Sequence, residues 1–117
     1  MTKLNLMKKL IIFIICTFSL WTINFNLPAK ALDTAKGAEI FSFHCAGCHI
    51  NGGNIIRRGK NLKKNALKKY RMDSLEAITN IVTNGKSNMS AYKDRLTTEE
   101  IQNVAAYVLE QAEKDWK

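Results

Sequence analysis

The sequence predicts a small all-α domain that runs from residue 32 to residue 117. Apolar residues recur at intervals of three and four in the segments 33–43, 75–84 and 97–112, which is the spacing of one helix face. No segment alternates polar and apolar residues as a half-buried strand would. A third observation, two cysteines followed by a histidine at 45–49, predicts what the helices surround.

Residues 1–31 are expected to be a cleaved signal peptide rather than part of the domain. Three lysines in 3–9 precede an apolar run over 10–21, and Ala29-Lys30-Ala31 supplies the small residues that a signal peptidase requires. The run is shorter than the roughly 20 residues that span a bilayer. We therefore expect cleavage after Ala31 rather than a retained membrane anchor, and no stable membrane insertion of the domain.

The first helix is expected to start at Asp33 or Thr34 and to end near Phe43, with Phe41 on its apolar face. Gly37 interrupts this helix at a cost of roughly 1 kcal/mol relative to alanine. Such a cost is understandable if another backbone or an aromatic ring approaches closely at that position.

The middle of the domain is expected to contain a loop over 50–54 and a short helix around 63–70. Ile55 and Ile56, between them, are expected to turn inward. A capping box over 73–76 predicts a helix start at Asp73, and Gly85 marks the end of that helix.

The last helix is predicted to open with a second capping box over 97–100. Its buried face is expected to consist of five residues at helical spacing: Ile101, Val104, Ala105, Val108 and Ala112.

The sequence Cys45-Ala46-Gly47-Cys48-His49 is typical of a c-type haem attachment site. Each thiol can form a thioether with one haem vinyl group, and the imidazole of His49 then lies below the iron. After export, an oxidising compartment would pair Cys45 with Cys48 unless another reaction consumed the thiols. A zinc site is disfavoured because no second ligand cluster exists, and a thioredoxin-like dithiol because its strand–helix context is missing.

The second iron ligand decides the chemistry, and residues 32–117 contain two methionines, Met72 and Met89. A thioether ligand favours ferrous iron and closes the site to oxygen, as an electron carrier requires. Met89 is favoured because it lies in a loop between two helices, from which it can reach the opposite haem face. His44 is too close to Cys45 to cross the ring. An open site would instead indicate a haem peroxidase or a gas sensor.

These residues resemble the class I cytochromes c and, within them, the cytochrome c6 family. The resemblance runs through the segments 37–41, 45–49, 52–54, 61–64, 84–89 and 106–109. It implies four to five helices around one haem c, thioethers at Cys45 and Cys48, and His49 and Met89 as axial ligands. It also implies that the first and last helices cross near Gly37.

The resemblance implies a soluble, monomeric electron carrier rather than an enzyme. Such a carrier takes electrons from the cytochrome b6f complex to photosystem I in the thylakoid lumen of a plastid or a cyanobacterium. The alternatives are a lower-potential lumenal paralogue and a periplasmic carrier that feeds a terminal oxidase. Two residues depart from the family pattern: Ser90 replaces a proline after Met89, and Ile81 stands where members have a glutamine near the haem.

A third departure is a basic segment over 57–71 that has no acidic residue. It comprises Arg57, Arg58, Lys60, Lys63, Lys64, Lys68, Lys69 and Arg71. Complementary charge raises association rates more than affinity, which predicts transient docking on acidic surfaces of both redox partners. A solvated lysine-rich helix that reflects codon bias is the alternative. The whole-chain charge of +8 falls to +4 without the first 31 residues, and an exported chain is not expected to bind nucleic acid.

Overall fold

The computed structural model describes residues 2–20 and 29–117, which belong to two compact units, Met1–Lys30 and Ala31–Lys117. The first unit contains helix α1 (Thr2–Leu20), and Trp21, at the end of the predicted apolar run, lies outside the described residues. None of the helices in the described ranges combines the length and the hydropathy that a membrane crossing needs. Cleavage after Ala31 stays a prediction.

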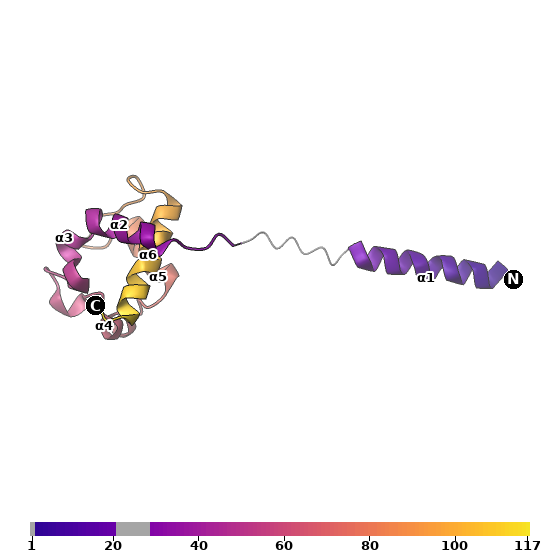
Figure 1. The fold of residues 1–117 in the computed structure, drawn as a ribbon, viewed down its shortest axis with the longest axis horizontal. Helices are drawn as coiled ribbons and strands as arrows, with labels where there is room; N and C mark the ends of the chain where they lie inside the picture. The colour runs from indigo at the N-terminus through magenta and orange to yellow at the C-terminus, as the bar shows by residue number, and fades with distance from the viewer. Residues whose placement is uncertain (1, 21–28) are drawn as a thin grey trace. The chain divides into compact units, whose positions relative to one another are not determined.

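The second unit contains five α-helices, within the predicted four to five (Figure 1). They are α2 (Thr34–His44), α3 (Ala46–His49), α4 (Lys64–Lys69), α5 (Leu75–Asn84) and α6 (Thr98–Glu113). Two short 3-10 turns, Ile50–Gly52 and Arg58–Lys60, lie between α3 and α4. Over residues 2–20 and 29–117 there is no strand beyond one isolated bridge between Lys86 and Met89, so the all-α prediction is confirmed.

Helix α6 provides the centre of the core, and it packs against α2 and α5. Its five predicted core residues are all buried, and the least exposed are Ala105 at 0% and Val104 at 1%. Ile40 and Phe41 reach the same core from α2, and Ile78 and Val82 reach it from α5. Burying such side chains stabilises the fold by about 1.5–3 kcal/mol each.

The crossing of α2 over α6 explains the glycine in the middle of α2. A Cβ atom at Gly37 would lie 2.2 Å from the backbone oxygen of Asn103 and 2.8 Å from the Cβ of Tyr107. No side chain fits between the two backbones at these distances. The predicted close approach at Gly37 is therefore confirmed, and its partner is α6.

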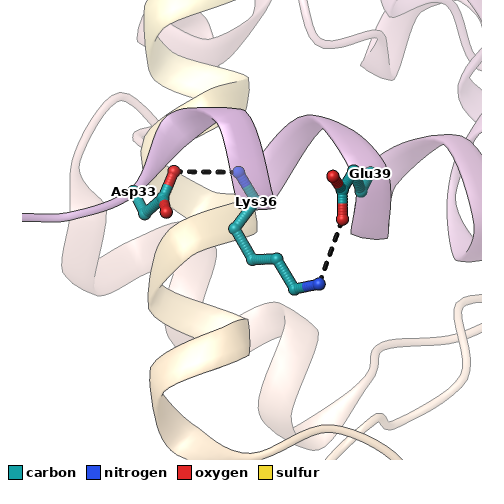
Figure 2. Close-up of polar contacts among 3 residues, drawn as sticks. All are labelled: Asp33, Lys36 and Glu39. Atoms are coloured by element: carbon teal, nitrogen blue, oxygen red, sulfur yellow. Dashed lines mark hydrogen bonds and ion pairs between the residues drawn. The ribbon is translucent and has the colours of Figure 1, made fainter.

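The start of α2 is fixed both locally and by α6. Asp33 caps the helix, since one of its carboxylate oxygens accepts a hydrogen bond of 2.9 Å from the backbone N–H of Lys36 (Figure 2). The ammonium of Lys36 forms an ion pair of 3.0 Å with Glu39 one turn later (Figure 2). The backbone N–H of Asp33 donates to the side-chain oxygen of the buried Asn103 at 3.0 Å.

Helix α5 begins one position later than predicted. Its cap is Ser74, whose hydroxyl oxygen accepts from the N–H of Ala77 at 3.1 Å, and Asp73 lies one residue outside it. Serine and aspartate cap helices about equally well, so the sequence alone does not decide whether Asp73 or Ser74 caps α5. The predicted end at Gly85 (φ 69°) and the predicted capping box of α6 are confirmed.

The prediction that Ile55 and Ile56 turn inward is wrong. Their side chains are 60% and 57% exposed. The cause is Asn54, whose side-chain oxygen accepts from the N–H groups of Ile56 (3.1 Å) and Arg57 (2.8 Å). This turn leaves both isoleucines exposed, and Ile56 nevertheless lines the cavity described below.

Candidate haem site

A cavity of about 350 Å³ collects the residues that the sequence singled out. Cys45, Cys48 and His49 line it from the α2–α3 junction, and Met89 lines it from the loop after α5. Most of the remaining wall is apolar and comes from four helices and the segment before α4: Phe41, Leu62, Leu67, Ile78, Val82, Val104 and Val108. The fold thus brings the cysteine motif and Met89 to one chamber although 40 positions separate His49 from Met89.

The cysteine motif forms a tight helical turn at one end of this cavity. Cys45 ends α2 by donating its N–H to the carbonyl of Phe41 at 2.9 Å, and its own carbonyl accepts from the N–H of His49 at 2.9 Å. The two thiols and the imidazole are therefore presented within one turn. Burial, together with the neighbouring Cys48, raises the pKa of the Cys45 thiol to about 11.

The His49 ring is oriented by a partner that the sequence did not predict. Its Nδ1 lies 2.8 Å from the carbonyl oxygen of Gly53, which can only accept a hydrogen bond. The proton therefore sits on Nδ1, and the lone pair of Nε2 is available to a metal. The sequence signal was the Gly52-Gly53 pair, which lets the chain fold back beneath the imidazole.

The loop that carries Met89 is held by backbone hydrogen bonds despite the serine at position 90. Lys86 and Met89 exchange two N–H···O bonds of 3.0 Å, closing a tight turn. Gly85 lies against this turn so closely that a Cβ would be 2.6 Å from the oxygen of Met89. These contacts restrain the backbone at Met89 without the φ restriction that a proline would add.

Tyr92 ties this loop to the end of α2, another role that the sequence did not reveal. Its hydroxyl donates to the carbonyl of His44 at 2.9 Å, and the Arg95 guanidinium lies 4.5 Å from its ring centre. The His44 ring lies edge-on to Tyr92 at 5.8 Å and also borders the cavity. Tyr92 thus connects the loop that carries Met89 to the end of α2, and both segments line the cavity.

Met72 and Ile81 also line the cavity. Both methionines considered as iron ligands are therefore at the site, and Ile81 lines the same space. A thiol pair, an imidazole with a free Nε2, a thioether and an apolar wall are the donors and surroundings that a covalently bound haem requires. The residues present fit this group.

All eight cationic residues of the basic segment are exposed. Arg57 and Lys60 border the cavity, so the segment reaches the site. Lys64 forms an ion pair of 2.5 Å with Glu113, and the ammonium of Lys60 lies 5.2 Å from the ring centre of Tyr70.

Comparisons with known proteins show the family to which the chain belongs. The family model described as cytochrome c oxidase, cbb3-type, subunit III, matches residues 32–108. The cytochrome c6-like protein of Nostoc sp. (strain PCC 7120) is 65% identical over 95% of this chain and 100% of its own length. Cytochrome c6 of the same strain is 50% identical over the same shares.

Solved structures have the same fold. Cytochrome c6C from Synechococcus sp. PCC 7002 is 64% identical with a TM-score of 0.68, covering 69% of this chain and 99% of that one. Cytochrome c6A from Arabidopsis thaliana is 32% identical with a TM-score of 0.68, covering 75% and 98%. Haem c is the cofactor of cytochrome c6 homologues, which carry electrons and are not enzymes. The chain belongs to the cytochrome c6 family of class I cytochromes c.

Proposed function

We propose that the chain is a one-electron carrier in which Cys45 and Cys48 hold the haem while His49 and Met89 bind its iron from opposite faces. One observation carries this proposal: all four residues line a single, largely apolar cavity. If His49 and Met89 both bound the iron, they would leave no coordination position for oxygen or peroxide. The proposal therefore favours electron transfer over peroxidase or gas-sensing chemistry.

Met89 is preferred to Met72 as the sixth ligand for two reasons. Its backbone is fixed by the paired bonds with Lys86, and its side chain lines the cavity from that turn. It also ends the segment 84–89, which matches the family pattern around the ligand methionine. Met72 lies between α4 and α5, with its N–H bonded to the carbonyl of Leu67 at 2.8 Å, and serves as a wall of the cavity.

When bound, haem supplies an iron that gains and loses one electron. The protein's residues keep the surroundings constant between the two states. The Gly53 carbonyl holds the His49 ring, the Lys86–Met89 turn holds the thioether, and buried side chains such as Val104 exclude water. Because these contacts would hold both ligands in place in either state, each electron transfer would involve little reorganisation.

The donor is proposed to be the cytochrome b6f complex and the acceptor photosystem I, in the thylakoid lumen. The basic segment supports transient docking because its eight cations are exposed and two of them border the cavity. A partner with an acidic surface would thus be steered to the haem edge. Export to a bacterial periplasm with a terminal oxidase as acceptor is the alternative.

A second candidate function is that of a lower-potential paralogue with a different acceptor. Ile81 favours it because an aliphatic side chain in the cavity cannot donate a hydrogen bond where the family's glutamine can. The identity pattern favours it too, since the chain is 65% identical to a cytochrome c6-like protein and 50% identical to cytochrome c6 of the same strain. The two candidates share the ligands and differ in potential and partner.

The ligand assignment is tested by replacing each methionine in turn with alanine. In the oxidised holoprotein, M89A is expected to lose the weak far-red Met–iron absorption band and to bind carbon monoxide when reduced. M72A is the matched control, because it removes the same thioether from another wall of the cavity, and it is expected to keep the band. Loss of the band in M72A alone would make Met72 the ligand. Carbon monoxide binding by the wild type would contradict a closed site.

The partner is tested by flash-induced reduction of photosystem I. If this complex is the acceptor, the second-order rate is expected to fall steeply with added salt, because exposed charges are screened within about 10 Å at 0.1 M. Replacing Lys63, Lys68 and Lys69 with glutamine is expected to lower both the rate and its salt dependence. A rapid reaction whose rate did not depend on salt would contradict steering by the basic segment.

The lower-potential alternative is tested with the I81Q variant, which is expected to have a higher reduction potential than the wild type. An unchanged potential would remove the support that Ile81 gives to the paralogue.

A further inference from the structure

We propose that Trp116 is a positioning residue for the imidazole of His49, acting through the Gly52-Gly53 turn. The inference rests on the proposed role of His49 as an iron ligand. Trp116 lies in the segment after α6, which belongs neither to the cysteine motif nor to the loop that carries Met89.

Trp116 reaches the haem site because the chain turns back after α6. Asp115 and Trp116 have left-handed backbone angles (φ 55° and 58°), which are unfavourable for residues with a side chain. The N–H of Trp116 donates to the carbonyl of Gln111 at 2.8 Å and fixes this turn. The indole then packs on Phe41, with the ring centres 5.1 Å apart. A turn against the local preference persists only where such tertiary contacts determine it.

The indole makes two contacts with the loop below His49. Its Nε1–H donates to the carbonyl of Leu62 at 3.0 Å. It also lies so close to Gly52 that a Cβ there would be 2.5 Å from the ring. Leu62 in turn donates its N–H to the carbonyl of Gly52 at 2.7 Å. Trp116, Leu62 and Gly52 thus form a closed set of contacts, and we call them the tryptophan clamp.

The clamp ends one residue before the carbonyl that holds His49. Gly52 is in the left-handed region (φ 71°), where a glycine has no side chain to limit rotation. Contact with the indole limits it instead and so fixes the direction of the Gly53 carbonyl. That carbonyl accepts the Nδ1–H of His49 at 2.8 Å. A hydrogen bond at this position makes a metal-binding imidazole more basic, which stabilises ferric iron and lowers the reduction potential.

The test is Trp116→Phe in the full holoprotein, since phenylalanine keeps a ring above Gly52 and removes the N–H donor. We expect the Nδ1–H of His49 in the ferrous protein to exchange with solvent on the order of tenfold faster. We also expect a higher reduction potential, with the Met–iron band retained. The matched control is Tyr107→Phe, which alters the same aromatic group but removes no contact to the loop.

Unchanged exchange and potential in Trp116→Phe would overturn the proposal. Equal changes in Trp116→Phe and Tyr107→Phe would also overturn it, because general packing would then explain them. If Trp116→Phe does not fold, Gly52→Ala disturbs the clamp from the loop side and is expected to shift both quantities in the same direction; no shift would refute the clamp. A wild-type protein without the Met–iron band would refute the ligand assignment at Met89, while exchange at the His49 Nδ1–H would still test the clamp.

Discussion

The contact between α2 and α6 makes Gly37→Ala the sharpest test of the fold. Alanine would ordinarily stabilise the interior of a helix by about 1 kcal/mol relative to glycine. Here the added methyl group would lie 2.2 Å from the backbone oxygen and 2.7 Å from the carbonyl carbon of Asn103. Backbone atoms cannot rotate away as a side chain can, so the two helices have to separate.

Overpacking of this kind costs about 1–3 kcal/mol, and the backbone contact places Gly37→Ala at the upper end of that range. After subtraction of the propensity gain, we expect a net loss of about 2 kcal/mol in the free energy of unfolding. For a domain of this size, that loss corresponds to a fall of about 8–16 °C in Tm.

The assay is urea unfolding of the holoprotein followed by helical circular dichroism. Gly59→Ala is the matched control, because a Cβ at Gly59 meets nothing within 4 Å and its φ is not positive. We expect that variant to lie within about 0.5 kcal/mol of the wild type. If Gly37→Ala were as stable as the wild type, the close crossing of α2 and α6 would be wrong.

The remaining predictions concern the cap of α6 and the hydrogen bond between Tyr92 and His44, and each is measured by urea unfolding. Thr97→Ala removes the hydroxyl that accepts from the N–H of Glu100 at 3.2 Å and is expected to cost about 1 kcal/mol; an unchanged midpoint would show that the cap does not contribute. Hydrogen bonds from the backbone and hydroxyl of Thr97 lower the pKa of Glu100. Its stabilising effect is therefore complete above the unfolded pKa of about 4.3 and is lost as the pH falls through the lower folded value. Glu100→Gln is expected to make the loss of stability at low pH less steep. An equally steep loss would contradict a contribution of Glu100 to it. Tyr92→Phe loses the hydrogen bond to His44 and is expected to cost about 0.5–1.5 kcal/mol while keeping the ring beside Arg95; equal stability would mean that the bond is replaced by water.

Features that depend on neighbouring residues were predictable from the sequence. The stripe of α6 follows from helical spacing alone, and its predicted residues are buried. The glycine in α2 was informative because its local cost had to be offset by a contact elsewhere, and Asn103 provides that contact. The cysteine motif is equally local, since one helical turn fixes its geometry.

Contacts between residues far apart in the chain, and the choice of one partner among chemically equivalent groups, were not predictable from the sequence. Every loop carbonyl looks alike in a sequence, so the choice of Gly53 as the partner of His49 left no signal beyond a glycine pair. The exposure of Ile55 and Ile56 depends on a turn formed by the Asn54 side chain, which competes with burial of the two apolar side chains. The bond from Trp116 to Leu62 joins residues 54 positions apart, which no local pattern encodes.

The hydrogen bond between Asp33 and Asn103 also has a consequence for the order of events during synthesis. These residues are 70 positions apart, so the start of α2 cannot gain this partner until residue 103 has been synthesised. Cys45 and Cys48 lie between them in the chain and are synthesised earlier. Over this interval Val104 and Val108 of α6 do not yet form their part of the cavity wall around the two thiols. A cut after Ala31 also leaves Asp33 in place, so such processing preserves the cap of α2.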